Sequence, residues 1–192
     1  MIKILKFDEV SDDEIFARVE NTVNVEQIVA DIIANVRKNG DKALFEYCEK
    51  FDHAKLNGLL VTREEIDEAV KSVEPRFLDI LRRAAENIRD FHRRQVRNSF
   101  IINEQDGIVT GQKVTPIEKV GLYVPGGTAA YPSTVLMDSI PAKIAGCPEI
   151  YMVTPPGKDG KVNPVILAAA KIAGVDTIYK IGGAQAVAAM AF

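Results

Sequence analysis

The feature that most constrains the fold is an alternation of short apolar strands with helix-length segments in the second half of the chain. Strands separated by helices of about 10–15 residues are typical of βαβ units. Right-handed crossovers then produce a parallel sheet, so we predict an α/β fold whose second half is an incomplete Rossmann-like parallel βαβαβ layer. The expected strands are residues 120–124, 149–154 and 177–181, and the expected helices are residues 133–145, which Pro141 should break or kink, 164–173, and one beginning at Gly182-Gly183.

Helical periodicity dominates the first half. From Val25, apolar residues recur at the i, i+3, i+4 and i+7 positions of an amphipathic helix. Thr62 and Glu65 have the spacing of a capping box, in which each side chain bonds to the other's backbone N–H group. The expected helices are residues 25–39, ended by Gly40, residues 41–50, one opened by Thr62, and one opened by Pro75 with Leu78, Leu81, Ala85, Ile88 and Phe91 along one side.

Between these two halves the sequence predicts a β-hairpin. Asp106-Gly107 separates two β-rich runs, residues 100–102 and 108–110, and we expect the loop to be longer than two residues. Strand character should continue over residues 112–118. We therefore divide the chain into a helix-rich N-terminal region with a β-hairpin, residues 1–112, and a Rossmann-like domain, residues 113–192.

Charge and hydropathy exclude several classes of protein. The chain of 192 residues has 24 Lys and Arg against 27 Asp and Glu, which argues against nucleic acid as the main partner. The arginines of residues 82–97 fit a solvated face balanced by Glu86 and Asp90 better than a phosphate-binding face. Early charges argue against a signal peptide, and no apolar run reaches the roughly 18 residues of a membrane span. We expect a cytoplasmic protein with no membrane contact.

The sequence offers no metal-binding or nucleophilic arrangement of its own. Cys48 and Cys147 are far apart, so we expect two free, mostly buried thiols. His53 and His92 have no Cys, His or carboxylate at ligand spacing, and we expect both to be structural or solvated. We therefore predict no metal ligand and no catalytic residue within this chain.

Glycine pairs follow two of the expected strands. They lie in residues 123–128 and 181–185, and ligands of open parallel sheets bind beyond the carboxyl ends of the strands. The glycines fit either ordinary turns or close approach of a ligand to a helix N-terminus, and neither segment matches the G-x-G-x-x-G fingerprint. By default Tyr123 would be a half-buried core aromatic residue and Gln185 a surface amide.

These glycine segments also carry a resemblance to a known family. Residues 120–147, which read VGLYVPGGTAAYPSTVLMDSIPAKIAGC, and residues 181–192, which read IGGAQAVAAMAF, closely resemble histidinol dehydrogenase. The resemblance implies a homodimeric enzyme of histidine biosynthesis that oxidises L-histidinol to L-histidine through the aldehyde, with NAD and zinc. It also implies an aldehyde dehydrogenase-like fold with an NAD-contacting domain over residues 113–192. Tyr123 and Gln185 match the family's NAD contacts, whereas its zinc ligands and acid–base pair lie in the part beyond residue 192.

From this resemblance we expect the isolated chain to be inactive. The last seven residues are all apolar, so we also expect that helix to be covered by a part that follows it, as in a truncated or split protein. One alternative is a non-catalytic nucleotide-binding or dimerisation module that pairs with a separate C-terminal half. Another is a structural role in which the N-terminal helices form a dimer contact.

Overall fold

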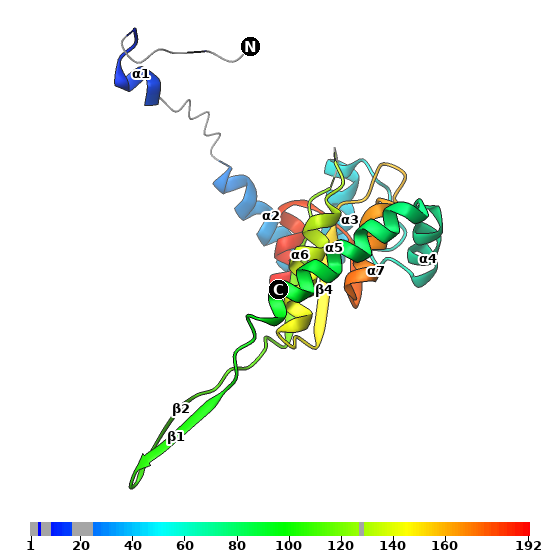
Figure 1. Cartoon of the computed structure of the whole chain (residues 1–192). Coiled ribbons are helices and arrows are strands. Elements are labelled where there is room, and N and C mark those ends of the chain that lie inside the picture. The colour runs from blue at the N-terminus through cyan, green and yellow to red at the C-terminus, as the bar shows by residue number, and fades with distance from the viewer. Residues whose placement is uncertain (1–3, 5–8, 17–24, 127–128) are drawn as a thin grey trace.

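The computed structural model describes residues 4, 9–16, 25–126 and 129–192. At its centre is a three-stranded sheet in the order β3-β4-β5, in which both neighbouring pairs are parallel (Figure 1). The predicted βαβαβ layer is therefore confirmed. Its elements are β3 (Lys119–Tyr123), α6 (Pro132–Ile144), β4 (Glu149–Thr154), α7 (Pro164–Ala173), β5 (Thr177–Lys180) and α8 (Gly183–Ala191).

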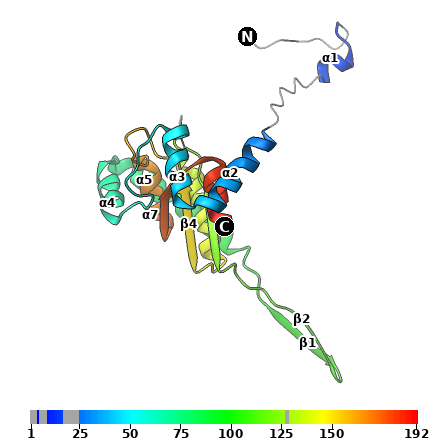
Figure 2. The same cartoon turned by 180° about the vertical axis from the view of Figure 1, so that it is seen from behind.

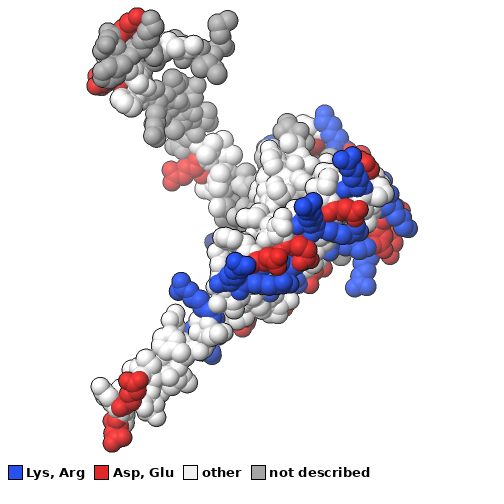
Figure 3. All heavy atoms as spheres, in the orientation of Figure 1, with Lys and Arg blue, Asp and Glu red and all other residues white. Residues whose placement is uncertain are grey.

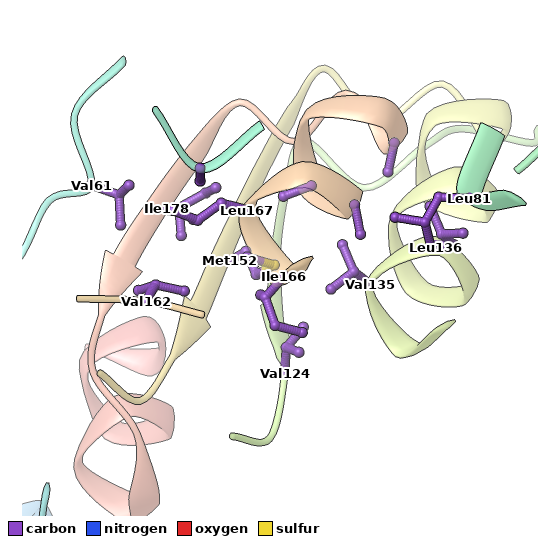
Figure 4. Packing of buried hydrophobic residues seen from close by; sticks show 14 of the residues in the cluster. Val61, Leu81, Val124, Val135, Leu136, Met152, Val162, Ile166, Leu167 and Ile178 are labelled. Carbon is purple, nitrogen blue, oxygen red and sulfur yellow. The ribbon is translucent and has the colours of Figure 1, made fainter. Parts of the chain in front are cut away.

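Each face of the sheet has its own hydrophobic core. Successive strand residues point to opposite faces, and in β4 the buried side chains of Met152 and Val153 enter different cores. The Met152 core, shown in Figure 4, contains residues of α6, α7, α4 (Arg63–Ser72) and α5 (Pro75–Arg93). The Val153 core contains residues of α8, α2 (Glu26–Asn39) and α3 (Asp41–Tyr47). Helices from the first half thus cover both faces of a sheet built by the second half.

The apolar helix at the end of the chain is covered from an unexpected direction. In α8, Ala186 and Ala188 are buried against α2, which precedes the sheet in the chain. The guanidinium of Arg37 on α2 lies 4.5 Å from the ring centroid of Phe192. Other residues of this apolar end remain exposed: the accessible fraction is 52% for Val187 and 69% for Phe192. The N-terminal half therefore covers part of this helix, and cover of the rest by a following segment stays a prediction.

Several helix predictions are confirmed in detail. Gly40, with a φ of 55°, follows the last residue of α2, and Pro75 is the first residue of α5. The capping box is complete, since Thr62 Oγ1 accepts from the Glu65 N–H at 3.2 Å and Glu65 Oε2 accepts from the Thr62 N–H at 2.8 Å. These features depend on residues close in sequence, which is why local patterns identify them.

Other predictions of local structure need correction in part. The helix expected over residues 41–50 is present, but it is α-helical only to Tyr47 and continues as a π-helix, η1 (Cys48–Asp52). Phe91, expected on the buried side of α5, is 64% exposed because it lies near the end of the helix, beyond the core. The helix expected over residues 133–145 is confirmed as α6, which continues past Pro141 to Ile144, so Pro141 does not break it; a kink there stays a prediction.

The β-hairpin is confirmed, but with a tighter turn than expected. Strands β1 (Phe100–Gln105) and β2 (Ile108–Gln112) pair antiparallel around Asp106-Gly107, so the loop has two residues, and Gly107 has a φ of 76°. Residues 113–118 form no strand, which corrects the prediction that β structure continues there. The hairpin projects from the body of the protein (Figures 1 and 2).

The helices of the first half and the sheet of the second half share both cores, so the boundary at residues 112 and 113 stays a prediction. The short helix α1 (Asp12–Phe16) precedes α2 in the chain and is drawn apart from the body of the protein (Figure 1). Among the described residues, no helix is both long and apolar enough to cross a membrane.

Candidate functional site

The carboxyl ends of the three parallel strands meet along one edge of the sheet. Tyr123, the last residue of β3, pairs with Val153, and Thr154, the last residue of β4, pairs with Lys180, the last residue of β5. The segments that follow the strands therefore leave the sheet side by side. In open α/β sheets this edge is the usual place for a ligand.

Close packing on Pro155 explains one glycine of each pair. A Cβ atom at Gly126 would lie 2.8 Å from Pro155 Cγ, and one at Gly182 would lie 2.6 Å from Pro155 Cβ. Neither glycine has a positive φ, so a turn conformation is not the reason for glycine there. Gly126 and Gly182 instead let the loops after all three strands contact one another, with Pro155 in the middle. Gly127, the other member of the first pair, lies outside the described residues.

Tyr123 reaches across the edge to the start of α8. Its hydroxyl oxygen accepts a hydrogen bond from the Gly183 N–H at 3.0 Å, and Gly183 adopts a φ of 65°. Because the Tyr123 hydroxyl accepts this bond, its own O–H group can still donate to a second acceptor. The Tyr123 side chain is 36% exposed. One of the N–H groups that we expected to be available to an anion at this helix N-terminus is thus already bonded to Tyr123.

Gln185 lies in the first turn of the same helix. Its side chain folds over Gly183, where a Cβ atom would come within 2.6 Å of Gln185 Oε1. The residue is only 1% exposed, so the expectation of a surface amide is wrong. Helical side chains point back toward the helix N-terminus, which brings this amide to Gly183. Tyr123 and Gln185, 62 positions apart by their numbers, therefore both lie next to Gly183.

A pocket of about 430 Å³ opens beyond the end of β4, and neither Tyr123 nor Gln185 is among its lining residues. Thr154, Pro155 and Gly126 form the side of the pocket nearest the sheet edge, and the remaining walls come from α4, the loop after β4 and the start of α7. Sequence analysis did not select these lining residues. The sequence feature that could have indicated this pocket is the Pro- and Gly-rich loop of residues 155–163, which directly follows the carboxyl end of a strand. The charged residues of the lining are Glu65, Glu68, Asp159 and Lys161.

An ion pair between Glu65 and Lys180 ties the pocket wall to the sheet. Lys180 Nζ donates to Glu65 Oε1, and the lysine side chain is only 12% exposed. Burial raises the pKa of Glu65, but the hydrogen bonds from Lys180 and from the Thr62 N–H outweigh it, so the net pKa is lower than usual. Glu65 therefore serves at once as capping residue of α4, ion-pair partner of β5 and lining residue of the pocket.

The cysteines and histidines stand apart from this edge. Both cysteines are free and buried, as predicted. Cys48 Sγ donates to the Lys180 carbonyl oxygen at 3.6 Å, and burial together with the nearby Asp52 raises its pKa to about 11, so it remains a thiol at neutral pH. His92 Nδ1 lies 2.6 Å from Gln95 Oε1 at the exposed end of α5. Within the described ranges, no group of three or more His, Cys, Asp or Glu residues is placed to hold a metal ion.

Known proteins match the chain over most of its length. It is 58% identical over 161 residues to a histidinol dehydrogenase of Clostridium acetobutylicum, covering 84% of this chain and 37% of that protein. It is 48% identical to a histidinol dehydrogenase of Heliobacterium mobile, covering 100% of this chain and 46% of that protein. The chain thus spans less than half the length of these curated relatives.

A solved structure and a family model agree with these relatives. The crystal structure of histidinol dehydrogenase from Elizabethkingia anophelis superposes with a TM-score of 0.86 at 40% identity, covering 91% of this chain and 40% of that one. The model of the family described as histidinol dehydrogenase matches residues 17–192. The chain belongs to the histidinol dehydrogenase family.

Proposed function

We propose that this chain contributes the NAD-binding part of an enzyme that oxidises L-histidinol to L-histidine, through the aldehyde, in histidine biosynthesis. The observation that carries the proposal is the placement of Tyr123 and Gln185 around Gly183, at the edge where open parallel sheets bind ligands. Both residues match the positions at which the family contacts NAD. Their roles as cofactor contacts, like the cytoplasmic location and the homodimer, remain predictions.

The residues present suit a dinucleotide in two ways. Tyr123 offers an O–H donor and a partly exposed ring, and the N-terminus of α8 favours a negatively charged group. The pocket lined by Gly126 and Pro155 adds a concave surface at the same sheet edge. When bound, NAD supplies the acceptor for the hydride that leaves the substrate. The task of this edge is to hold and orient the cofactor, and it contributes no proton-transfer group in this proposal.

Zinc, unlike NAD, has no suitable binding residues in the described part of this chain. The described residues contain no cluster suited to a metal ion, and catalytic zinc needs about three protein ligands. We therefore derive no step through zinc from this chain. We propose that the zinc ligands and the acid–base residues belong to the part of the relatives that this chain does not span, and that the isolated chain does not oxidise histidinol.

The test is calorimetric titration of the chain with NAD, alongside an assay for NADH formation from histidinol. We expect binding without turnover. Tyr123→Phe should weaken binding about fivefold to tenfold, since it removes one hydroxyl contact. Tyr151→Phe is the matched control, because its hydroxyl bonds to Glu149 away from the carboxyl edge, and it should bind like the wild type.

Three outcomes would count against the proposal. Equal NAD affinity in the wild type and in Tyr123→Phe would remove the edge as the binding site. NADH formation by the isolated chain would overturn the assignment of the catalytic residues to the part of the relatives that this chain does not span. Binding of NAD that stays without turnover after the matching C-terminal half is added would favour the non-catalytic nucleotide-binding module instead.

A further inference from the structure

The hairpin of β1 and β2 exposes an unusual amount of apolar surface. All residues from Phe100 to Gln112 are exposed, with Ile101 78%, Val109 67% and Phe100 51% accessible. It extends away from the body in both views (Figures 1 and 2). An isolated two-stranded hairpin is at best marginally stable in water, and exposed apolar patches mark interaction sites. The hairpin is therefore built to contact something.

Apolar side chains occupy both faces of the hairpin. Phe100 and Ile102 are two positions apart in β1 and point to one face. Ile101 points to the other face, opposite Gly111, and shares that face with Val109. The tip carries two acidic residues, Glu104 and Asp106, and Figure 3 shows their charge at the far end of the hairpin. A partner surface should thus be apolar with basic residues nearby.

One surface of the same chain has this composition. Along α5 and its C-cap residue, five exposed residues spaced about one helical turn or a multiple apart form a surface that we call the α5 stripe: Arg76, Ile80, Arg83, Phe91 and Arg94. Ile80 is 54% and Phe91 64% exposed. Within the described part of the chain, no ion pair involves the three arginines of the stripe, whereas Arg82, Arg89 and Arg93 pair with Asp79, Glu86 and Asp90. Figure 3 shows the charged band of this helix.

We propose that the hairpin of one chain docks on the α5 stripe of a second copy. Its apolar residues would cover Ile80 and Phe91, and Glu104 and Asp106, at the far end of the hairpin, would meet Arg76 and Arg83. The proposal specifies the contact surface of the homodimer suggested under the proposed function, and it rests on that dimer alone and not on NAD binding.

The position of the hairpin in the chain suits a twofold arrangement. It follows α5 after residues 94–99, and it projects beyond the C-terminal end of that helix. A twofold axis beside this connection would lay each hairpin along the α5 stripe of the other copy and bury both contacts. The lengths are compatible, because six strand residues span roughly 20 Å and nineteen helical residues about 28 Å. The acceptor is a second copy because both complementary surfaces occur in one chain.

Sedimentation of the chain and its variants tests the contact. The wild type should have twice the monomer mass of 21.1 kDa at tens of micromolar. The double variant Ile101→Asp with Val109→Asp should sediment as a monomer with an unchanged circular dichroism spectrum, because neither side chain is buried within the chain. Met137→Asp, at a 50% exposed apolar residue of α6, is the matched control and should remain dimeric. A monomeric wild type, or dimeric hairpin variants, would overturn the proposal.

Charge reversal tests the choice of the α5 stripe. Glu104→Arg with Asp106→Arg should weaken the dimer at least tenfold, and so should Arg76→Glu with Arg83→Glu. The chain that carries all four changes should regain the dimer, because each hairpin then meets a stripe of opposite charge. Failure of the fourfold variant to recover would exclude the stripe as the acceptor. NAD titration of each variant separates this result from the proposed function, since cofactor affinity should not change.

Discussion

The parallel sheet and the projecting hairpin are both built from β-rich segments, yet opposite conditions stabilise them. In β4, Met152 and Val153 are buried on the two faces by helices, whereas no residue of the hairpin is buried. The sheet owes its stability to burial of apolar surface by segments from elsewhere in the chain. The hairpin depends on its own strand pairing, its Asp106-Gly107 turn and, in our proposal, a second copy. Strand-forming sequence therefore predicts a strand but not what covers it.

The largest expected effect separates these two regions directly. Ile166→Ala, in the core between α7 and the sheet, should lower the free energy of unfolding by about 2–5 kcal/mol, because it removes a side chain that is 1% exposed. The same change at Ile101 in the hairpin should alter the unfolding of the monomer by less than about 0.5 kcal/mol. Urea denaturation of both variants at low protein concentration measures the difference. Equal losses would show that the hairpin belongs to the same folding unit as the sheet.

A second, smaller effect concerns the carboxyl edge. Gly182→Ala places a methyl group against Pro155 and should destabilise the protein by about 1–3 kcal/mol, because loops after all three strands meet there. Gly58→Ala is the control, since nothing lies within 4 Å of its Cβ position and its φ is not positive. Thermal unfolding of the two variants compares them. A Gly182→Ala protein as stable as Gly58→Ala would mean that the edge is loosely packed, as the hairpin is.

The smallest effect comes from the ion pair that joins the pocket wall to β5. The pKa of Glu65 is lowered in the folded protein, so this group stabilises the fold above its ordinary pKa of 4.5 and loses that contribution as the pH falls below it. Glu65→Gln should cost on the order of 1 kcal/mol at pH 7, where only the wild type has the charged pair. Below the folded pKa of Glu65, the wild type should lose its advantage over the variant.

Urea denaturation at neutral and acidic pH measures this difference, with Glu64→Gln, at an exposed neighbour in the same helix turn, as the control. A Glu65→Gln deficit that persists unchanged in acid would assign the effect to the capping box and not to Lys180.

Features that depend on neighbours in sequence could be predicted well. The strand–helix alternation, the capping box at Thr62, the stop at Gly40 and the Asp106-Gly107 turn all follow from short-range patterns, and the structure contains each of them. The resemblance of residues 120–147 and 181–192 to one family also needed only the sequence, and the family model agrees. Two departures from the predictions, the π-helical end of the helix at residues 41–50 and the exposure of Phe91, concern positions where local patterns are ambiguous.

What the sequence determined by itself was therefore the order and type of the elements, the family, and the candidate residues Tyr123 and Gln185. Only the tertiary structure decided that Gln185 is buried, that Gly126 and Gly182 enclose Pro155, and that α2 covers α8. The physical reason is the separation in sequence between the residues that interact. Hydrogen-bonded turns and caps are settled within a few residues, whereas burial and close approach depend on which distant segments the chain brings into contact.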